Sequence, residues 1–208
     1  MATKEEIERY QRRYETGDTP WDSGRPDKNL VNFLKTAQLS GKKALEIGCG
    51  TGENAIFLAQ NGFDVTATEI VPLALDKARE KAEKQGVSIN FLVKDIMDED
   101  IPGKPFDFAF DRGCFHHYKT PEERLKFARR LAQHLGDRGI WLCLAGNSDG
   151  EKVHGQGPPK RTAQEMVAAV EPFFEILLLK SGEFDSNMTP PPRCWIMVAR
   201  KRKSGPQK

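Results

Sequence analysis

A glycine-rich segment from Ala44 to Gly52 holds the residues best suited to bind a nucleotide-like ligand. An apolar run leads into three glycines at alternate positions, Gly48, Gly50 and Gly52, and a stretch with helical spacing follows. Glycine permits a tight turn and lets a ligand approach the backbone, because no Cβ stands in the way. We therefore expect this loop to lie in the first crevice of an open α/β sheet, where nucleotides bind.

An acidic residue at a suitable distance strengthens this interpretation. Glu69 ends the next predicted strand, 21 residues after Gly48. A carboxylate in that place can accept hydrogen bonds from both hydroxyls of a ribose. For either feature alone, the alternative is a structural turn with an exposed glutamate at a strand end. The joint spacing of strand, loop, helix, strand and glutamate disfavours that alternative.

A second group of reactive side chains follows the predicted fourth strand, in the run from Asp111 to Tyr118. Imidazole titrates near neutrality, so His116 or His117 can take a proton from a thiol or hydroxyl nucleophile. A thiolate needs little more than a nearby cation, such as Arg112. Either histidine could equally cap a helix or bond to a backbone group, so its role stays open. A metal site is disfavoured because adjacent histidines diverge and no fourth ligand is spaced for them.

The elements that must position these side chains alternate between strands and helices. The pattern predicts strands over 43–47, 64–69, 89–93, 106–110, 139–144, 174–179 and 195–199. It predicts helices over 53–60, 72–85, 122–135 and 162–170, with Thr162 as an N-cap and Gly136 ending the third helix. This order indicates an α/β fold, with a mostly parallel sheet and helices on both faces.

Composition limits the class of protein. The 208 residues are 38% hydrophobic and 30% charged, with a net charge of +2. We expect an N-terminal helical lid segment over 1–40, one domain over 41–200 and a basic flexible tail over 201–208. The balanced charge favours neither nucleic acid nor an anionic membrane as a partner, and no apolar run reaches the roughly 18 residues of a membrane helix. Oligomeric state has no signal in the sequence.

Targeting and cysteine patterns agree with that class. The N-terminus lacks the apolar core of a signal peptide. The four cysteines are scattered, which favours neither a disulfide framework nor a structural zinc site. We therefore expect a soluble protein of the reducing cytoplasm.

The string Glu46-x-Gly48-x-Gly50-x-Gly52 resembles the first motif of the class I S-adenosylmethionine-dependent methyltransferases. A nicotinamide-binding loop would place its third glycine at position 53, which is Glu53 here. Seven strands that close with an antiparallel final strand also resemble the Rossmann-like sheet of that family. The resemblance implies S-adenosylmethionine as the cofactor and a small molecule as the methyl acceptor. The alternatives are an NAD-linked oxidoreductase and a catalytically silent S-adenosylmethionine-binding module.

The resemblance also implies roles for single residues. Glu46 would lie near the amino group of the cofactor, Glu69 would hold its ribose, and Asp95 would meet its adenine amino group. The implied cofactor site comprises Trp21, Arg25, Glu46, Gly48, Cys49, Gly50, Gly52, Glu69, Ile70, Asp95, Ile96 and Asp111. The implied catalytic candidates are Arg112, His116 and His117, with no metal.

A shorter string, Pro20-Trp21-Asp22-Ser23-Gly24, is similar to one in the thiol, halide and thiopurine methyltransferases and in tellurite-resistance-type relatives. It implies a lid over the cofactor, with Trp21 facing the sulfonium and Arg25 pairing with the methionine carboxylate. A loop that plugs the sheet edge is the alternative. The loop that carries the histidines departs from that branch, so the acceptor stays open between a thiol, a halide or metalloid and another small metabolite. Segments 147–161, with His154, and 188–193 are expected to complete the pocket wall.

Overall fold

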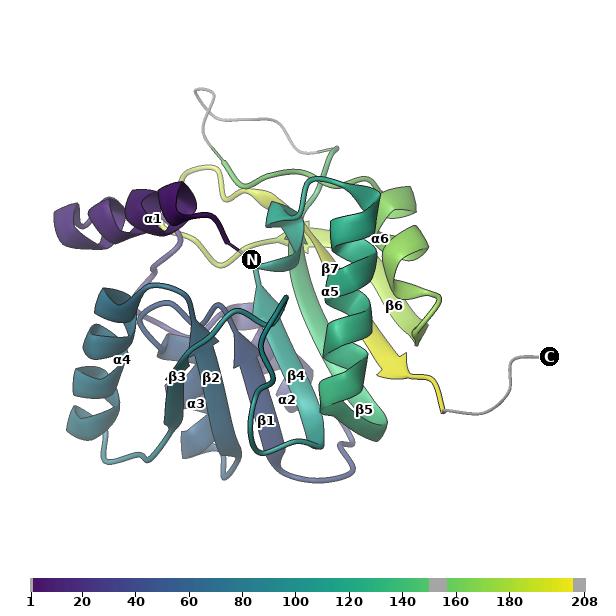
Figure 1. Ribbon diagram of the computed structural model, residues 1–208, viewed down its shortest axis with the longest axis horizontal. Helices are drawn as coiled ribbons and strands as arrows, with labels where there is room; N and C mark the ends of the chain where they lie inside the picture. The colour runs from purple at the N-terminus through teal and green to yellow at the C-terminus, as the bar shows by residue number, and fades with distance from the viewer. Residues whose placement is uncertain (1, 150–156, 204–208) are drawn as a thin grey trace.

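The computed structural model describes residues 2–149 and 157–203, so His154 and the last residues of the predicted tail lie outside the described residues. Its centre is a seven-stranded sheet in the order β3-β2-β1-β4-β5-β7-β6 (Figure 1). The strands are β1 (Lys43–Ile47), β2 (Asp64–Glu69), β3 (Asn90–Val93), β4 (Phe106–Arg112), β5 (Leu135–Gly146), β6 (Phe174–Glu183) and β7 (Arg193–Lys201). β1 to β5 pair in parallel, and β7 is antiparallel to both of its neighbours. The predicted mostly parallel sheet with an antiparallel final strand is confirmed.

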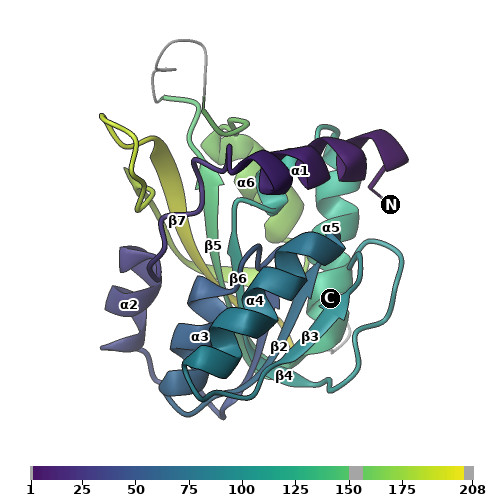
Figure 2. The ribbon, with the colours of Figure 1, turned by 90° about the vertical axis from the view of Figure 1, so that its left-hand side faces the viewer.

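Helices cover both faces of this sheet. They are α1 (Lys4–Thr16), α2 (Lys28–Leu34), α3 (Glu53–Gln60), α4 (Pro72–Lys84), the 3-10 turn η1 (Phe115–His117), α5 (Pro121–His134) and α6 (Ala163–Val170). Figures 1 and 2 show α2, α3 and α4 on one face and α5 and α6 on the other. Because successive side chains of a strand point to opposite faces, β1 contributes to both apolar layers. Leu45 packs in the layer that contains Phe127 of α5, and Ala44 packs in the layer that contains Leu58 of α3.

Three helices begin with the same local device. In each, a threonine caps the backbone three residues later, and a glutamate at that position bonds back to the threonine's own N–H. The pairs are Thr3 with Glu6, Thr120 with Glu123 and Thr162 with Glu165. Two otherwise unpaired backbone donors are thereby satisfied at each helix start. The prediction of Thr162 as an N-cap is confirmed.

The predicted stop at Gly136 is wrong. α5 ends at His134, and Leu135 caps it in an extended conformation. Leu135 is 1% exposed and is also the first residue of β5, where it pairs with Phe106. The chain therefore passes from helix directly into strand, and a left-handed glycine cap is not needed.

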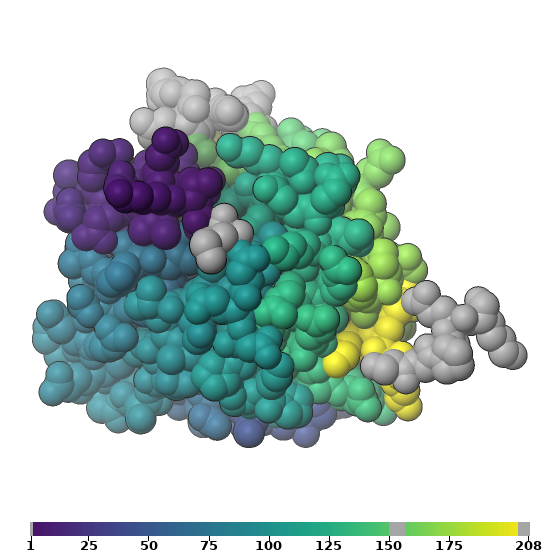
Figure 3. Space-filling view, viewed as in Figure 1, coloured from purple at the N-terminus to yellow at the C-terminus, as the bar shows by residue number. Residues whose placement is uncertain are grey.

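α1 lies across the carboxyl ends of the parallel strands (Figures 1 and 2). In the space-filling view, the purple atoms of the N-terminal segment lie above the blue and teal atoms of the segments that follow it in the chain (Figure 3). Tyr14 of α1 is only 5% exposed and packs with Val71 and Ala74 at the start of α4. None of the helices among the described residues has the length and apolar character needed to span a membrane.

Candidate active site

A cavity of about 560 Å³ opens at the carboxyl ends of β1, β2 and β4, next to α1. Small-molecule sites commonly have this size. The cavity brings together every site residue predicted from the sequence except Asp111. Those residues are Trp21, Arg25, Glu46, Gly48, Cys49, Gly50, Gly52, Glu69, Ile70, Asp95, Ile96, Arg112, His116 and His117.

The glycine loop follows β1, and its backbone conformation favours glycine at three positions. Gly48, Gly50 and Gly52 have φ values of 65°, 54° and 87°, in the left-handed region that favours glycine. A Cβ on Gly50 would lie 3.1 Å from the Tyr14 hydroxyl, and one on Gly52 would lie 2.9 Å from the Cβ of Ala78. The loop is therefore held between α1 above it and α4 beside it.

The Glu69 carboxylate accepts hydrogen bonds from two loops, the glycine loop and the turn before α4. Its carboxylate accepts hydrogen bonds from the backbone N–H groups of Gly50 (3.0 Å), Ile70 (2.7 Å) and Val71 (3.1 Å). Burial raises the pKa of Glu69, while these three donors act against that rise. The side chain is 8% exposed and lines the cavity, so the carboxylate is fixed in place with its edge available to a ligand.

Glu46 carries an unsatisfied polar atom into the same cavity. It is 1% exposed; Oε1 accepts from Asn54 Nδ2 at 3.2 Å, and Oε2 has no hydrogen-bond partner within residues 2–149 and 157–203. Burial raises the pKa of Glu46 to about 8. Buried polar atoms are nearly always paired, so this oxygen is available to a donor from a ligand or a water. An ammonium group fits, because it would supply both the hydrogen bond and the charge that favours the ionised carboxylate.

The strand-three acid, Asp95, lines the cavity next to the start of the chain. Asp95 Oδ1 accepts from Met97 N at 2.9 Å, and Oδ2 accepts from Ala2 N at 2.7 Å. Ile96 is 1% exposed, and both residues line the cavity. The segment before α1 therefore closes over the place expected for the adenine.

Arg112 does not present a free guanidinium to a reacting group. Its Nε donates to Asp27 Oδ2 at 2.7 Å, Nη1 donates to the Trp21 carbonyl at 3.0 Å, and Nη2 donates to the Asp185 carbonyl. The Arg112 side chain is 12% exposed and that of Asp27 is 1% exposed. The guanidinium thus joins β4 to the loop before α2 and to the β6–β7 connection.

Arg25 is likewise engaged within the chain. Its guanidinium donates to Asp185 Oδ1 at 2.7 Å and to Asn187 Oδ1 at 3.0 Å. In this structure the carboxylate that Arg25 pairs with belongs to Asp185. Pairing with the methionine carboxylate of a cofactor stays a prediction.

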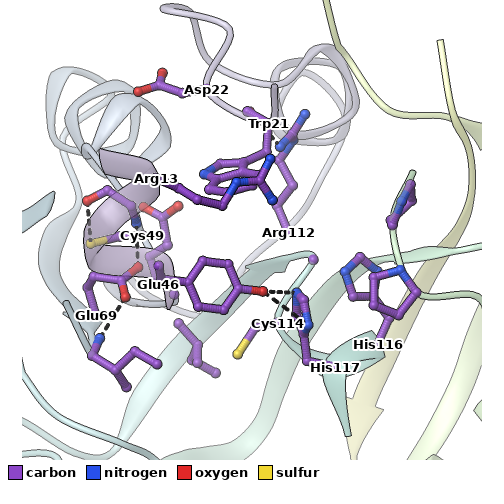
Figure 4. A pocket seen from close by; sticks show the side chains of 18 of the residues that line it. Arg13, Trp21, Asp22, Glu46, Cys49, Glu69, Arg112, Cys114, His116 and His117 are labelled. Atoms are coloured by element: carbon purple, nitrogen blue, oxygen red, sulfur yellow. Dashed lines mark hydrogen bonds between the residues drawn. The ribbon is translucent and has the colours of Figure 1, made fainter. Parts of the chain in front are cut away.

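The two histidines occupy the side of the cavity away from Glu69 and Cys49 (Figure 4). His116 is 4% exposed, and its Nδ1 accepts from the Gly146 N–H at 2.9 Å. The Tyr10 hydroxyl of α1 lies 3.1 Å from His117 Nε2. Burial lowers the pKa of His116 well below its usual value and that of His117 to about 4. Both rings are neutral at pH 7.

Asp111 does not line the cavity; it holds the loop that carries the two histidines by accepting hydrogen bonds from its backbone. Its side chain is fully buried, and Oδ1 accepts from Cys114 N (2.7 Å) and Phe115 N (2.9 Å). These bonds set the turn that leads into η1. Burial raises the pKa of the Cys114 thiol well above its usual value, so this wall residue is not a ready nucleophile.

Tyr10 and Tyr14 of α1 form an aromatic wall of the cavity with Trp21, and these two tyrosines were not predicted as site residues. The Trp21 ring centroid lies 5.7 Å from that of Tyr10 and 6.1 Å from that of Tyr14, and the Arg13 guanidinium lies 4.3 Å from the Trp21 ring. Tyr10 and Tyr14 are four residues apart, so they share one face of a helix. This four-residue spacing is the sequence feature that could have predicted the pair of tyrosine rings.

The sheet order, the glycine loop and the two buried carboxylates have the arrangement expected of a class I S-adenosylmethionine-dependent methyltransferase domain. Comparison with known proteins agrees: residues 44–139 match the family described as a methyltransferase domain.

Two plant proteins and one solved structure are similar to this chain. A probable thiol methyltransferase 2 from Arabidopsis thaliana is 28% identical over 65% of this chain and 60% of its own length. A thiocyanate methyltransferase 1 from Brassica oleracea is 30% identical over 72% of this chain and 65% of its own length. The chain thus spans less than two thirds of either relative. A structure solved in work on the conversion of a disulfide bond into a thioacetal group during echinomycin biosynthesis has a TM-score of 0.79 at 23% identity, covering 89% of this chain and 85% of that one.

Proposed function

We propose that this protein transfers the methyl group of S-adenosylmethionine to a small acceptor that reacts as an anion, with a thiolate as the favoured kind. The observation that carries the proposal is the electrostatic character of the cavity near the histidines. Neutral imidazoles and cationic side chains surround that end, and the carboxylates there are already engaged.

The cations near His116 and His117 come from different elements. Arg9 and Lys119 line the cavity, and together with Arg161 they act to lower the pKa of His117, against the opposite effect of Glu6. A positive environment stabilises an approaching anion and disfavours a cationic acceptor such as an ammonium.

The carboxylates at this end are poor candidates for a general base. Glu6 accepts from Thr3 N at 2.9 Å, and Glu123 accepts from Lys119 N at 2.8 Å and from Thr120 N at 3.0 Å. Both are capping residues whose oxygens are held by helix starts. An acceptor that arrives already ionised needs no base, which fits this arrangement.

The other end of the cavity would hold the cofactor. Bound S-adenosylmethionine supplies an electrophilic methyl group on a positively charged sulfur. Glu46 would receive the amino group on its unpaired Oε2, Glu69 would accept the ribose hydroxyls, and Ile96 would pack against the adenine ring. The lid residues Trp21 and Tyr14 would exclude water from the reacting atoms, which strengthens electrostatic interactions inside the cavity.

The relatives add independent support, since both are named for sulfur-containing acceptors. Methyl transfer to a thiolate or thiocyanate is the chemistry that their names describe, and it comes to this chain as part of the proposal.

The test is a panel of acceptors with S-adenosylhomocysteine release as the readout. We expect turnover with thiocyanate or small thiols, and for thiols a kcat/KM that rises with the fraction of thiolate. Amines and alcohols of similar size serve as matched controls and should be inactive. Turnover of amines or alcohols without thiols or thiocyanate would refute the proposal. Stabilisation by NAD, and not by S-adenosylhomocysteine, in thermal unfolding would overturn the cofactor assignment as well.

A further inference from the structure

The hydrogen bond from Gly146 N to His116 Nδ1 fixes the tautomer of His116. A backbone N–H can donate only to an unprotonated ring nitrogen, so Nδ1 is the acceptor and the proton of the neutral ring is on Nε2. The bond is 2.9 Å long and buried, and it comes from the last residue of β5. Nδ1 is therefore unavailable as a base, and Nε2–H is a donor.

The geometry around Nε2 keeps that donor open. Among the described residues Nε2 has no hydrogen-bond partner, and His116 lines the cavity. A Cβ on Gly113 would lie 3.4 Å from Nε2 and 3.3 Å from Cε1, and these are the only atoms it would approach. Gly113, at φ 84°, thus exposes the edge of the imidazole that a side chain there would cover.

Burial and the cations around the ring keep it neutral. Burial has the largest effect, and Arg112 at the end of β4, Arg161 before α6 and, when protonated, His117 in η1 also disfavour the imidazolium. Phe184 packs edge-on, with ring centroids 6.2 Å apart, and adds apolar surface.

We propose that His116 is a neutral hydrogen-bond donor whose Nε2–H binds and orients the anionic acceptor, and that it is not a general base. The inference rests on the proposed function, because it names the group that recognises the acceptor. No proton moves in this role: the acceptor would form its bond to the methyl carbon with its own electron pair, while the bond from that carbon to the sulfur of the cofactor would break and leave its electron pair on the sulfur. His116 keeps the Nε2 proton throughout.

Two substitutions separate the two nitrogens of the ring. His116→Asn places an amide oxygen where Nδ1 was, so the Gly146 N–H stays satisfied while the Nε2 donor is lost. His116→Gln can place an amide N–H₂ near the Nε2 position but removes the Nδ1 acceptor and leaves the Gly146 N–H unpaired.

The kinetic test uses the full chain with thiocyanate, an anion at every pH used. We expect His116→Asn to raise the KM for thiocyanate by roughly 10- to 100-fold, the loss of a hydrogen bond to a charged group, with a Tm close to that of the wild type. His116→Gln should keep a KM closer to the wild type but lower the Tm by roughly 2–10 °C, because a buried donor is left unpaired. An unchanged KM in His116→Asn overturns the inference. So does a wild-type kcat/KM that, with thiocyanate, titrates as the deprotonation of a histidine.

A direct measurement makes the inference independent of turnover. Nitrogen-15 NMR of the histidines should show His116 protonated on Nε2, with the Nε2 resonance shifted by thiocyanate in the presence of S-adenosylhomocysteine. His134 is an internal control, because its Nε2 accepts from Ile101 N (3.0 Å) and its Nδ1 bonds to the Arg130 carbonyl (2.8 Å), which requires the opposite tautomer. Protonation of His116 on Nδ1 overturns the inference. If no anion or thiol is methylated but the tautomer and the thiocyanate shift are observed, the proposed function fails while the donor assignment stands.

Discussion

Replacing Arg112 by methionine tests whether this residue organises the lid or acts on the acceptor. The substitution keeps much of the aliphatic stem and removes the guanidinium that bonds to Asp27, to Trp21 and to Asp185. Asp27 would keep its bonds from Asn29 N (2.8 Å) and Asp185 N (3.2 Å), yet its carboxylate, at 1% exposure, would lose its only cationic contact among the described ion pairs.

The size of the expected loss of stability follows from the burial of the ion pair between Asp27 and Arg112. Removing one partner of a buried ion pair costs about 3–5 kcal/mol of unfolding free energy, because the other charge stays buried. For a chain of 208 residues, each kcal/mol lowers the Tm by roughly 2–4 °C, so we expect a drop of roughly 6–20 °C. The double variant Asp27→Asn with Arg112→Met should recover part of that loss, since it leaves no buried charge unpaired.

Thermal and urea unfolding of the wild type, both single variants and the double variant measure this coupling. A Tm for Arg112→Met within about 2 °C of the wild type, together with a large fall in kcat, would refute the reasoning. That result would mean that the guanidinium acts on the acceptor and that its three contacts contribute little to the stability of the protein.

Three further outcomes follow from the cofactor end of the cavity. The pKa of Glu46 is about 8 in the folded chain and near 4.5 in the unfolded chain, so Glu46 contributes stability that is lost as the pH rises from 4.5 to about 8. A plot of Tm against pH should therefore be flatter over that range in Glu46→Gln than in the wild type. An equal slope would contradict the assignment. Glu69→Gln should weaken S-adenosylhomocysteine binding by roughly tenfold or more in calorimetry, through the loss of a charge-assisted hydrogen bond; an unchanged Kd would show that the ribose lies elsewhere. Gly52→Ala should lower the free energy of unfolding by about 1–3 kcal/mol, because its Cβ would lie 2.9 Å from that of Ala78 on a backbone with φ 87°; Gly62→Ala, with a similar φ of 80° and open space around it, is the control for backbone strain alone.

Local patterns predicted the first half of the sheet well. β1, α3 and β2 have the predicted bounds, because a buried strand, a glycine loop and an amphipathic helix each leave a distinct periodicity. The later strands are longer than predicted: β5 extends from Leu135 to Gly146, through the exposed Asp137 and Arg138. Such polar residues resemble a loop in sequence. Asp137 and Arg138 lie at an irregularity in the register, and only the pairing of Leu135 with Phe106 and of Ile140 with Phe108 on either side shows that they are within the strand.

The candidate site was predictable where its residues lie in one motif and unpredictable where distant segments meet. The glycine loop and Glu69 form one local unit, and the structure places both in the cavity. The ion pair of Asp27 with Arg112 spans 85 positions of sequence, and nothing in either segment points to the other. The tautomer of His116 depends on Gly146, thirty positions away, so only three-dimensional contacts distinguish its two nitrogens.

The attachment of Asp185 has a consequence for redesigning the protein. The backbone of this residue is held on both sides, since its N–H donates to Asp27 and its carbonyl accepts from Arg112. Ser186, Met188 and Pro192, which follow in the connection to β7, line the cavity. Asp185 is therefore a natural junction for grafting: segments of different length can replace 186–192 and remodel that wall of the cavity, while the bonds of Asp185 to Asp27, Arg112 and Arg25 are kept.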